Sequence, residues 1–329
     1  MRVPGLRTLS AVLVATLAGG ITTLSAQEKP ADFPQRPINL TVMYPAGGAV
    51  DVTARTFAEV AGQMLGHDFR VENRLGGAGI VGHTHLAKTA RPDGYTVGVI
   101  ANPFMFTDIL LRDAEFTIDE FEPLATISFD PVIWLVNAKS EIGEQSFEEI
   151  MATAKERTLQ VGMNPDSMFL FVSEFIEQAQ DVEFNFIPFD GGRQGVIALL
   201  AGDIDATAAF YTEVEQYIEN GDLKAVAVTG DERHPRLPDT PTLAELGVPA
   251  GGQTWGATRF FTVHPDTPED RKAYLEAAFL EALQSEEMAA AFEEAGLTLT
   301  PADAEQTQER YRQTFEDLQS FLRSTGRIN

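Results

Sequence analysis

The sequence predicts an α/β protein made of two lobes that are joined by two crossing strands. The first observation is that apolar strand-like and amphipathic helix-like segments alternate over most of its 329 residues, a pattern typical of βαβ units and parallel sheets. The second is that some strand candidates hold short runs with no polar alternation, such as Ala225-Val226-Ala227-Val228, as expected where helices cover both faces of a sheet. The third is that segments 124–136 and 223–231 have the features of crossings between lobes.

The predicted elements follow in order along the chain. Strands are expected at 38–43, 69–72, 95–101, 124–136, 159–163, 184–188, 204–210, 223–229 and 256–263. Helices are expected at 50–65, 80–90, 146–157, 167–179, 193–202, 211–220, 268–284, 286–295 and 302–323. The two crossings assign residues 33–126 and 231–329 to lobe I and residues 127–230 to lobe II. Two linkers between two lobes indicate a hinge with the ligand between the lobes.

The N-terminal segment 1–26 has the features of a secretory signal peptide. Arg2 and Arg7 accompany an apolar stretch from Leu9 to Ile21, and Leu24-Ser25-Ala26 matches a cleavage site. The apolar stretch is shorter than the roughly 20 residues that a membrane-spanning helix needs. We therefore expect a cleaved signal and a soluble exported protein, most simply in the periplasm of a Gram-negative bacterium.

Composition excludes several classes of function. The chain contains no cysteine, which excludes disulfides, thiol catalysis, thiolate metal sites and a lipid-anchor cysteine. Its formal charge of −25 at pH 7 makes nucleic acid and anionic membranes poor partners. An anionic small molecule is still compatible with this charge, because local backbone donors can overcome a distant field that salt screens.

The first strand and the loop after it are the most informative element. The strand candidate 38–43, rich in apolar residues, is followed by Pro45 and by Ala46-Gly47-Gly48-Ala49, which leads into a helix. Glycine lets the backbone approach a ligand closely, and a helix start leaves N–H groups unpaired at the positive end of the helix dipole. The loop therefore predicts an anion site that needs no cationic side chain.

Two similar loops are predicted in the second lobe. The first is Gly162-Met163-Asn164-Pro165-Asp166-Ser167, which follows a strand and opens a helix that Asp166 or Ser167 would cap. The second is Pro188-Phe189-Asp190-Gly191-Gly192-Arg193, one βα unit later. Each alone is compatible with an ordinary turn. Together with the first loop they favour a shared ligand site between the lobes.

No catalytic or cofactor-binding set of residues emerges. The segment Gly77-Ala78-Gly79-Ile80-Val81-Gly82 matches the dinucleotide pattern, but Val97 to Pro103 lacks the acidic residue that would hold the ribose. His83 and His85 would point to different faces of a helix, which argues against a metal site. The sequence has no G-x-S-x-G, P-loop, EF-hand or H-E-x-x-H motif. We therefore expect no cofactor, no metal and no enzymatic activity.

Five phrases of the sequence together resemble one protein family. They are YPAGGAVDVTAR, VENRLGGAGIVG, ARPDGYTVGV, FIPFDGGRQGVIALLAGDIDA and LKAVAVTGDERHPRLPDTPTLAELGVP. In this order they resemble the periplasmic substrate-binding proteins of tripartite tricarboxylate transporters, the Bordetella-uptake-gene type. The resemblance implies a type II periplasmic-binding-protein fold with two Rossmann-like lobes. It also implies a small organic carboxylate ligand, such as a di- or tricarboxylate or an acidic amino acid, that is passed to a membrane permease. We expect a monomer.

The resemblance also implies ligand-binding positions in both lobes. In lobe I they are Tyr44, Pro45, Ala46, Gly47, Gly48, Val50, Asp51 and Asn102. In lobe II they are Asn164, Asp166, Ser167, Met168, Asp190, Gly191 and Gly192, with Phe210 near the hinge. Backbone amides of the first loop, together with bridging waters, are implied to hold one carboxylate.

Two acidic residues leave the identity of the ligand open. Asp166 stands where family members often have a Gly/Ser-rich loop, and it would repel a carboxylate unless it pointed away or met a cationic group. The bulky Met168 and Phe169 would shrink or line the pocket. Asp51 either stabilises its helix dipole or faces the ligand, where it would favour an ammonium group. A ligand-presenting sensor subunit and an exported enzyme are the alternatives to a transport function.

Overall fold

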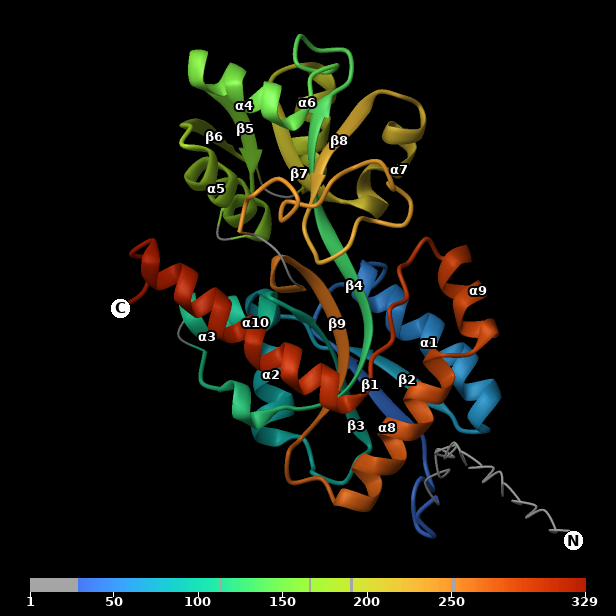
Figure 1. The fold of residues 1–329 in the computed structure, drawn as a ribbon. Coiled ribbons are helices and arrows are strands. Elements are labelled where there is room, and N and C mark those ends of the chain that lie inside the picture. The colour runs from blue at the N-terminus through green and yellow to red at the C-terminus, as the bar shows by residue number, and fades with distance from the viewer. Residues whose placement is uncertain (1–28, 113, 166, 190–191, 250–252) are drawn as a thin grey trace, which may run out of the picture.

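The chain folds into two α/β lobes, seen one above the other in a computed structural model (Figure 1). The structure describes residues 29–112, 114–165, 167–189, 192–249 and 253–329. The predicted fold class, an α/β protein with two lobes, is confirmed. The predicted signal peptide, 1–26, lies outside the described residues.

The strands form a nine-stranded sheet in the order β2-β1-β3-β9-β4-β7-β5-β6, and β8 also pairs with β4. Lobe I contains β1 (Ile38–Val42), β2 (Phe69–Asn73), β3 (Thr96–Asn102) and β9 (Gly256–Val263). Lobe II contains β5 (Leu159–Met163), β6 (Phe184–Pro188), β7 (Ala206–Phe210) and β8 (Leu223–Val228). The pairs β1–β2, β1–β3, β5–β6 and β5–β7 are all parallel, as the alternation of strands and helices predicts.

Strand β4 (Glu122–Asn137) runs from one lobe into the other (Figure 1). Its first part pairs with β9, ending at Pro131 opposite Gly256. Its second part pairs with β7 on one edge and β8 on the other, beginning with Val132 opposite Phe210. The change of lobe therefore falls at the Asp130-Pro131 step that interrupts the apolar run.

Helices cover both lobes and follow the predicted segments closely, except for α3, which lies where no helix was predicted. They are α1 (Ala49–Leu65), α2 (Ile80–Thr84), α3 (Phe104–Leu111), α4 (Phe147–Glu156), α5 (Met168–Gln180), α6 (Gly192–Ala201), α7 (Tyr211–Glu219), α8 (Glu269–Leu283), α9 (Glu286–Glu294) and α10 (Ala304–Ser324). A π-helical turn, His85–Thr89, continues α2. Short three-ten turns occur at Gly77–Gly79, Ile118–Glu120 and Gln253–Trp255. None of the helices in the described ranges is long and apolar enough to span a membrane.

Aromatic side chains fill the cores and also connect the lobes. In lobe I, Phe57 packs against Phe261 with ring centroids 4.5 Å apart. At the C-terminal end of α10, Phe321 lies 4.5 Å from Phe175 of α5 and 5.3 Å from Trp255, measured between ring centroids. Because α5 belongs to lobe II, the end of α10 forms a contact between the lobes.

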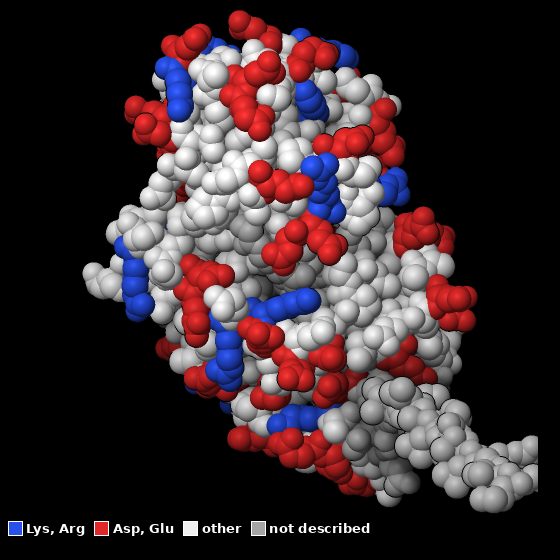
Figure 2. Space-filling view, in the orientation of Figure 1, with Lys and Arg blue, Asp and Glu red and all other residues white. Residues whose placement is uncertain are grey.

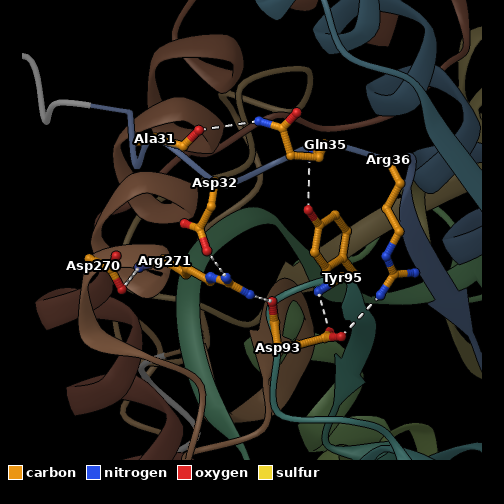
Figure 3. Close-up of polar contacts among 8 residues, drawn as sticks. All are labelled: Ala31, Asp32, Gln35, Arg36, Asp93, Tyr95, Asp270 and Arg271. Atoms are coloured by element: carbon orange, nitrogen blue, oxygen red, sulfur yellow. Dashed lines mark hydrogen bonds and ion pairs between the residues drawn. The ribbon is translucent and has the colours of Figure 1, made fainter.

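The segment before β1 is tied to lobe I at the edge away from lobe II (Figures 1 and 3). The Tyr95 hydroxyl accepts a hydrogen bond from the Gln35 amide at 2.8 Å, and Arg36 forms an ion pair with Asp93 at 3.0 Å. Arg271 of α8 donates to the Asp93 carbonyl and pairs with Asp32, both at 2.8 Å. These contacts hold residues 32–36 against lobe I, and their position at the amino ends of the strands gives them a structural role.

The exact bounds of the two lobes stay a prediction. The chain after β8 remains beside that strand for some distance, since the Val228 amide donates to the Pro241 carbonyl at 3.0 Å. The Leu243 amide in turn donates to the Val228 carbonyl at 2.8 Å. Residues 241–243 therefore contact the lobe II sheet.

Candidate functional site

The carboxyl ends of the parallel strands of both lobes face the point where β4 changes lobe. Asn102, the last residue of β3, pairs with Thr258 of β9, which itself pairs with Phe129 of β4. Phe210, the last residue of β7, pairs with Val132. Phe129 and Val132 are three residues apart in β4, so the two edges are separated by roughly 10 Å at the strand rise of about 3.4 Å per residue. Ligands of open α/β sheets bind beside such edges, and the spacing suits a small molecule.

The glycine loop presents the start of α1 to this region. Gly47 has a φ of +79°, which favours glycine, and the Gly48 amide donates to the Pro45 carbonyl at 3.1 Å. Gly48 is the N-cap of α1 and has no side chain to cap it. Among the described residues, no acceptor is found for the amides of Ala49 and Val50. The first turn of α1 therefore offers backbone donors to an anion.

The carboxylate of Asp51 holds this loop in place through hydrogen bonds. Its Oδ2 accepts from the Gly47 amide at 2.8 Å and from Arg55 Nε at 2.9 Å, and its Oδ1 accepts from Asn73 Nδ2 at 2.8 Å. Asn73 Nδ2 also donates to the Tyr44 carbonyl at 3.0 Å. Asp51 is 1% exposed. Burial by itself raises the pKa of Asp51, but the hydrogen bonds from Arg55, Gly47 and Asn73 outweigh it and hold the pKa below its usual value.

The other predicted residues of lobe I differ in exposure. Pro45 and Ala46 are exposed at the tip of the loop, whereas Val50 is buried in the lobe I core. The Tyr44 hydroxyl donates to the Ala101 carbonyl at 3.4 Å. Burial, and secondarily the charge of Asp108, raises the pKa of Tyr44 far above its usual value, so it stays a neutral donor. Asn102 is buried, and its Oδ1 has no partner among the described residues.

In lobe II, the predicted loop after β5 is held by its own side chains. Asn164 Nδ2 donates to the Phe189 carbonyl at 3.0 Å, and the Ser167 hydroxyl donates to the Asn164 carbonyl at 2.7 Å. Ser167 also caps α5. Met168 is buried within the core. The predicted residues Asp166, Asp190 and Gly191 lie outside the described residues.

A cluster that the sequence did not reveal lies at the starts of the lobe II helices. The rings of Phe169 (α5) and Phe210 (before α7) are 5.1 Å apart. A Cβ atom built on Gly192 (α6) would lie 3.1 Å from the Phe169 ring and 3.3 Å from both carboxylate oxygens of Glu213. Glu213 Oε2 accepts from the Phe210 amide at 3.0 Å. The only sequence signal was the position of Glu213, three residues after a helix cap, where glutamate commonly accepts from the backbone.

A buried ion pair lies where β4 changes lobe. Asp130 pairs with Arg259 of β9 and contacts the Thr298 hydroxyl, and both charged side chains are less than 10% exposed. Arg259 Nη1 also donates to the Ser128 hydroxyl at 3.0 Å. Burial raises the pKa of Asp130, and the charge of Arg259 opposes this shift. The pair joins β4 and β9 at the point where β4 changes lobe.

A cavity lies on the edge of β4 away from β9 and β7. The Thr300 amide donates to the Ile127 carbonyl at 2.9 Å on the edge away from β9, and β8 lies on the edge away from β7. A cavity of about 400 Å³ is lined from this side by Phe129, Pro131, residues 231–235, residues 298–300 and Arg310. Strand β4 therefore separates it from the loops that carry the predicted ligand residues.

The acidic residues do not mark a site by themselves. Figure 2 shows Asp and Glu side chains spread over both lobes on the visible face, without one dominant patch. Within the described part of the chain, no group of three or more His, Asp or Glu side chains could hold a metal ion. The ordered backbone donors at α1 thus remain the most specific feature of the region between the lobes.

Comparisons with known proteins place this arrangement in a family. Residues 53–324 match the family model described as the tripartite tricarboxylate transporter family receptor. The "UPF0065 protein in gbd 5'region" of Cupriavidus necator is 34% identical over 244 residues, which is 72% of each chain. Protein BugT of Bordetella pertussis is 28% identical over 302 residues, which is 89% of this chain and 90% of BugT.

Solved structures show the same two-lobed fold. A TctC solute-binding protein from Polaromonas, crystallised without ligand, is 28% identical with a TM-score of 0.80, covering 89% of this chain and 99% of its own. MatC from Rhodopseudomonas palustris, with bound malate, is 24% identical with a TM-score of 0.68 and covers 88% and 100%. An R. palustris protein with adipate is 23% identical with a TM-score of 0.73 and covers 90% and 99%. The predicted periplasmic-binding-protein fold and the predicted family are confirmed: this chain belongs to the tripartite tricarboxylate transporter receptor family, a family of periplasmic solute-binding proteins.

Proposed function

We propose that this protein captures a small organic carboxylate between its lobes in the periplasm and passes it to the membrane permease of a tripartite tricarboxylate transporter. The observation that carries the proposal is the start of α1. Its first-turn amides have no acceptor among the described residues, and its glycine loop is braced by a buried Asp51. A preorganised set of backbone donors binds a carboxylate without the cost of ordering a flexible loop.

The position of these donors supports the same conclusion. They follow β1 at the carboxyl edge of the lobe I sheet, and α5 and α6 begin after β5 and β6 at the corresponding edge of lobe II. A ligand that contacts both edges binds more tightly when the lobes are closed than when they are open. Its binding would therefore favour the closed arrangement of the lobes. Charge-assisted hydrogen bonds become stronger as closure removes water, which lets backbone amides hold an anion despite the net charge of −25.

The known proteins with this fold support the chemical class of the ligand. Two of them were solved with malate and with adipate, which are both dicarboxylates. Because they are distant in sequence, they support a carboxylate in general and do not select one compound. The proposal assigns no catalytic role to any residue of the site.

Binding can be tested with the purified protein and a panel of malate, succinate, adipate, citrate, glutamate and benzoate. A true ligand stabilises the folded state by mass action, so the melting temperature should rise with ligand concentration. The neutral diamide of adipic acid is the matched control and should produce no shift, because it lacks the anion. The absence of a shift with every carboxylate would contradict the proposal.

Transport can be separated from the two alternatives with the same ligand. Vesicles that contain the permease should accumulate the labelled carboxylate only when the binding protein is added. A ligand-presenting sensor would give no uptake, and an enzyme would convert the compound. Either result would overturn the transport part of the proposal.

A further inference from the structure

Glu213 places a carboxylate directly beside the start of α6 in lobe II. Both of its carboxylate oxygens lie 3.3 Å from the position that a Cβ atom on Gly192 would take. Gly192 is the first residue of α6, and Phe169, the second residue of α5, lies on the other side of the same position at 3.1 Å. The side chain of Glu213 therefore lies among the helix starts that face lobe I.

One oxygen of this carboxylate has no partner among the described residues, so a ligand can approach it. Oε2 accepts from the Phe210 amide at 3.0 Å, and in the described part of the chain Oε1 has no hydrogen-bond or ion-pair partner. Glu213 is exposed to solvent. The surrounding protein nevertheless desolvates the carboxylate enough to raise its pKa, an effect that the Phe210 amide opposes. Glu215, on the same helix, instead pairs with Arg236 at 3.0 Å.

The two edges of the site thus differ in charge. The lobe I edge ends in the α1 donors, which no side chain caps. The lobe II edge carries the fixed negative charge of Glu213 next to α6. A second carboxylate of a ligand would be repelled there, whereas an ammonium group or another hydrogen-bond donor would be attracted.

We infer that Glu213 is a specificity-determining residue that selects carboxylates with an ammonium group, or another donor, at the end that faces lobe II. The inference rests on the proposed function, since it assumes that a carboxylate occupies the α1 end. It makes the ligand class asymmetric: one anionic end and one donor end, linked by a short chain. Symmetric dicarboxylates, such as those bound by two proteins of the same fold, are then poor ligands.

The test compares pairs of compounds that differ only at one end. Glutarate is paired with 5-aminopentanoate, and adipate with 6-aminohexanoate, and the dissociation constants are measured by calorimetry. We expect the wild-type protein to bind the amino compound of at least one pair about tenfold tighter than the dicarboxylate. The reason is that the ammonium group forms a charge-assisted hydrogen bond with Glu213, whereas a second carboxylate is repelled by it. In Glu213→Gln this ratio should fall by about tenfold or more, while the Gln side-chain oxygen still accepts from the Phe210 amide.

Two further variants make the result specific. Glu215→Gln removes the same charge from the same helix, and it should leave the ratio within about twofold because Glu215 points to Arg236. Gly192→Ala keeps the charge but displaces the Glu213 carboxylate, since the new Cβ would be 3.3 Å from both oxygens. Gly192→Ala should lower the preference for the amino compound as Glu213→Gln does. It therefore provides an independent test if Glu213→Gln folds poorly.

The outcomes separate the inference from the proposed function. If carboxylates bind but the wild type prefers the dicarboxylates, or Glu213→Gln and Gly192→Ala leave the ratio unchanged, the inference is overturned and the proposed function stands. If none of these compounds and no carboxylate of the panel above binds, the proposed function fails, and the inference fails with it. If only the panel compounds bind, the inference is overturned and the proposed function stands. An equal loss of ratio in Glu215→Gln would attribute the effect to net charge and would also overturn the inference.

Discussion

Replacing Ala49 by proline tests the α1 donors without altering any side-chain charge. Ala49 is the first residue of α1, where proline is tolerated because the N–H it lacks has no helical acceptor. Gly48 has φ −76° and ψ 164°, an extended conformation that a following proline permits. Ala49 is also exposed, so the ring meets no packed core. The substitution therefore removes one N–H donor and leaves the rest of the loop in place.

The expected loss follows from the hydrogen bond that is removed. A hydrogen bond to a charged group contributes about 1.5–3 kcal/mol, so the affinity for a carboxylate should fall roughly 10- to 150-fold. The free energy of unfolding without ligand should change by less than about 1 kcal/mol. Calorimetric titration and urea unfolding measure the two quantities.

The matched control is Glu286→Pro, at the exposed first position of α9, which lies outside the site. It should leave the affinity unchanged. Equal affinity in Ala49→Pro and the wild type would refute the assignment of the α1 amides. A loss of stability as large as the loss of binding free energy would show instead that the loop had been distorted.

Three further predictions concern the supports of the site and can be tested by urea unfolding. Asp51→Ala removes the acceptor of three hydrogen bonds and should cost about 2 kcal/mol at neutral pH. Because the folded-state pKa of Asp51 is lowered, the difference in unfolding free energy between the wild type and this variant should shrink as the pH falls through that pKa. A difference that grows in acid would contradict the hydrogen bonds assigned to the Asp51 carboxylate. Asp130→Asn leaves Arg259 buried without its counter-charge and should lower the free energy of unfolding by about 3–5 kcal/mol. Asp130→Ala combined with Arg259→Met should lower it less. Additive losses of unfolding free energy would contradict the pairing. Phe321→Ala should cost about 3–5 kcal/mol, because its ring is buried against Phe175 and Trp255, and a loss below about 1 kcal/mol would show that the contact between the lobes does not hold.

Sequence periodicity located most of the fold because the elements that it detects are long and regular. The strand expected at 124–136 extends over Glu122–Asn137, and the helix expected at 50–65 is Ala49–Leu65. The helix Phe104–Leu111 was missed because it is short and mostly apolar, with Met105 and Phe106 fully buried. A segment that is buried on most sides shows no amphipathic pattern, so periodicity cannot identify it.

The candidate site was predictable only where it depends on neighbouring residues in the sequence. The glycine loop and the start of α1 are contiguous, so their composition alone predicted backbone donors. The proximity of Glu213 to Gly192 depends on how α6 and α7 pack, which a list of carboxylates in an acidic chain cannot reveal. The pairing of Asp130 with Arg259 likewise requires the register of β4 and β9. The role of Asp51 also depends on its partners in space, because its carboxylate accepts hydrogen bonds from Gly47, Arg55 and Asn73 and so holds the glycine loop in place.

The most direct test of the central claim is a crystal structure of the protein with the tightest-binding carboxylate of the panel. We predict one carboxylate group within hydrogen-bond distance of the Ala49 and Val50 amides, enclosed between the two lobes beside Asn102 and Phe210. A ligand bound instead in the cavity on the other edge of β4, among Phe129, Leu299 and Arg310, would contradict the claim.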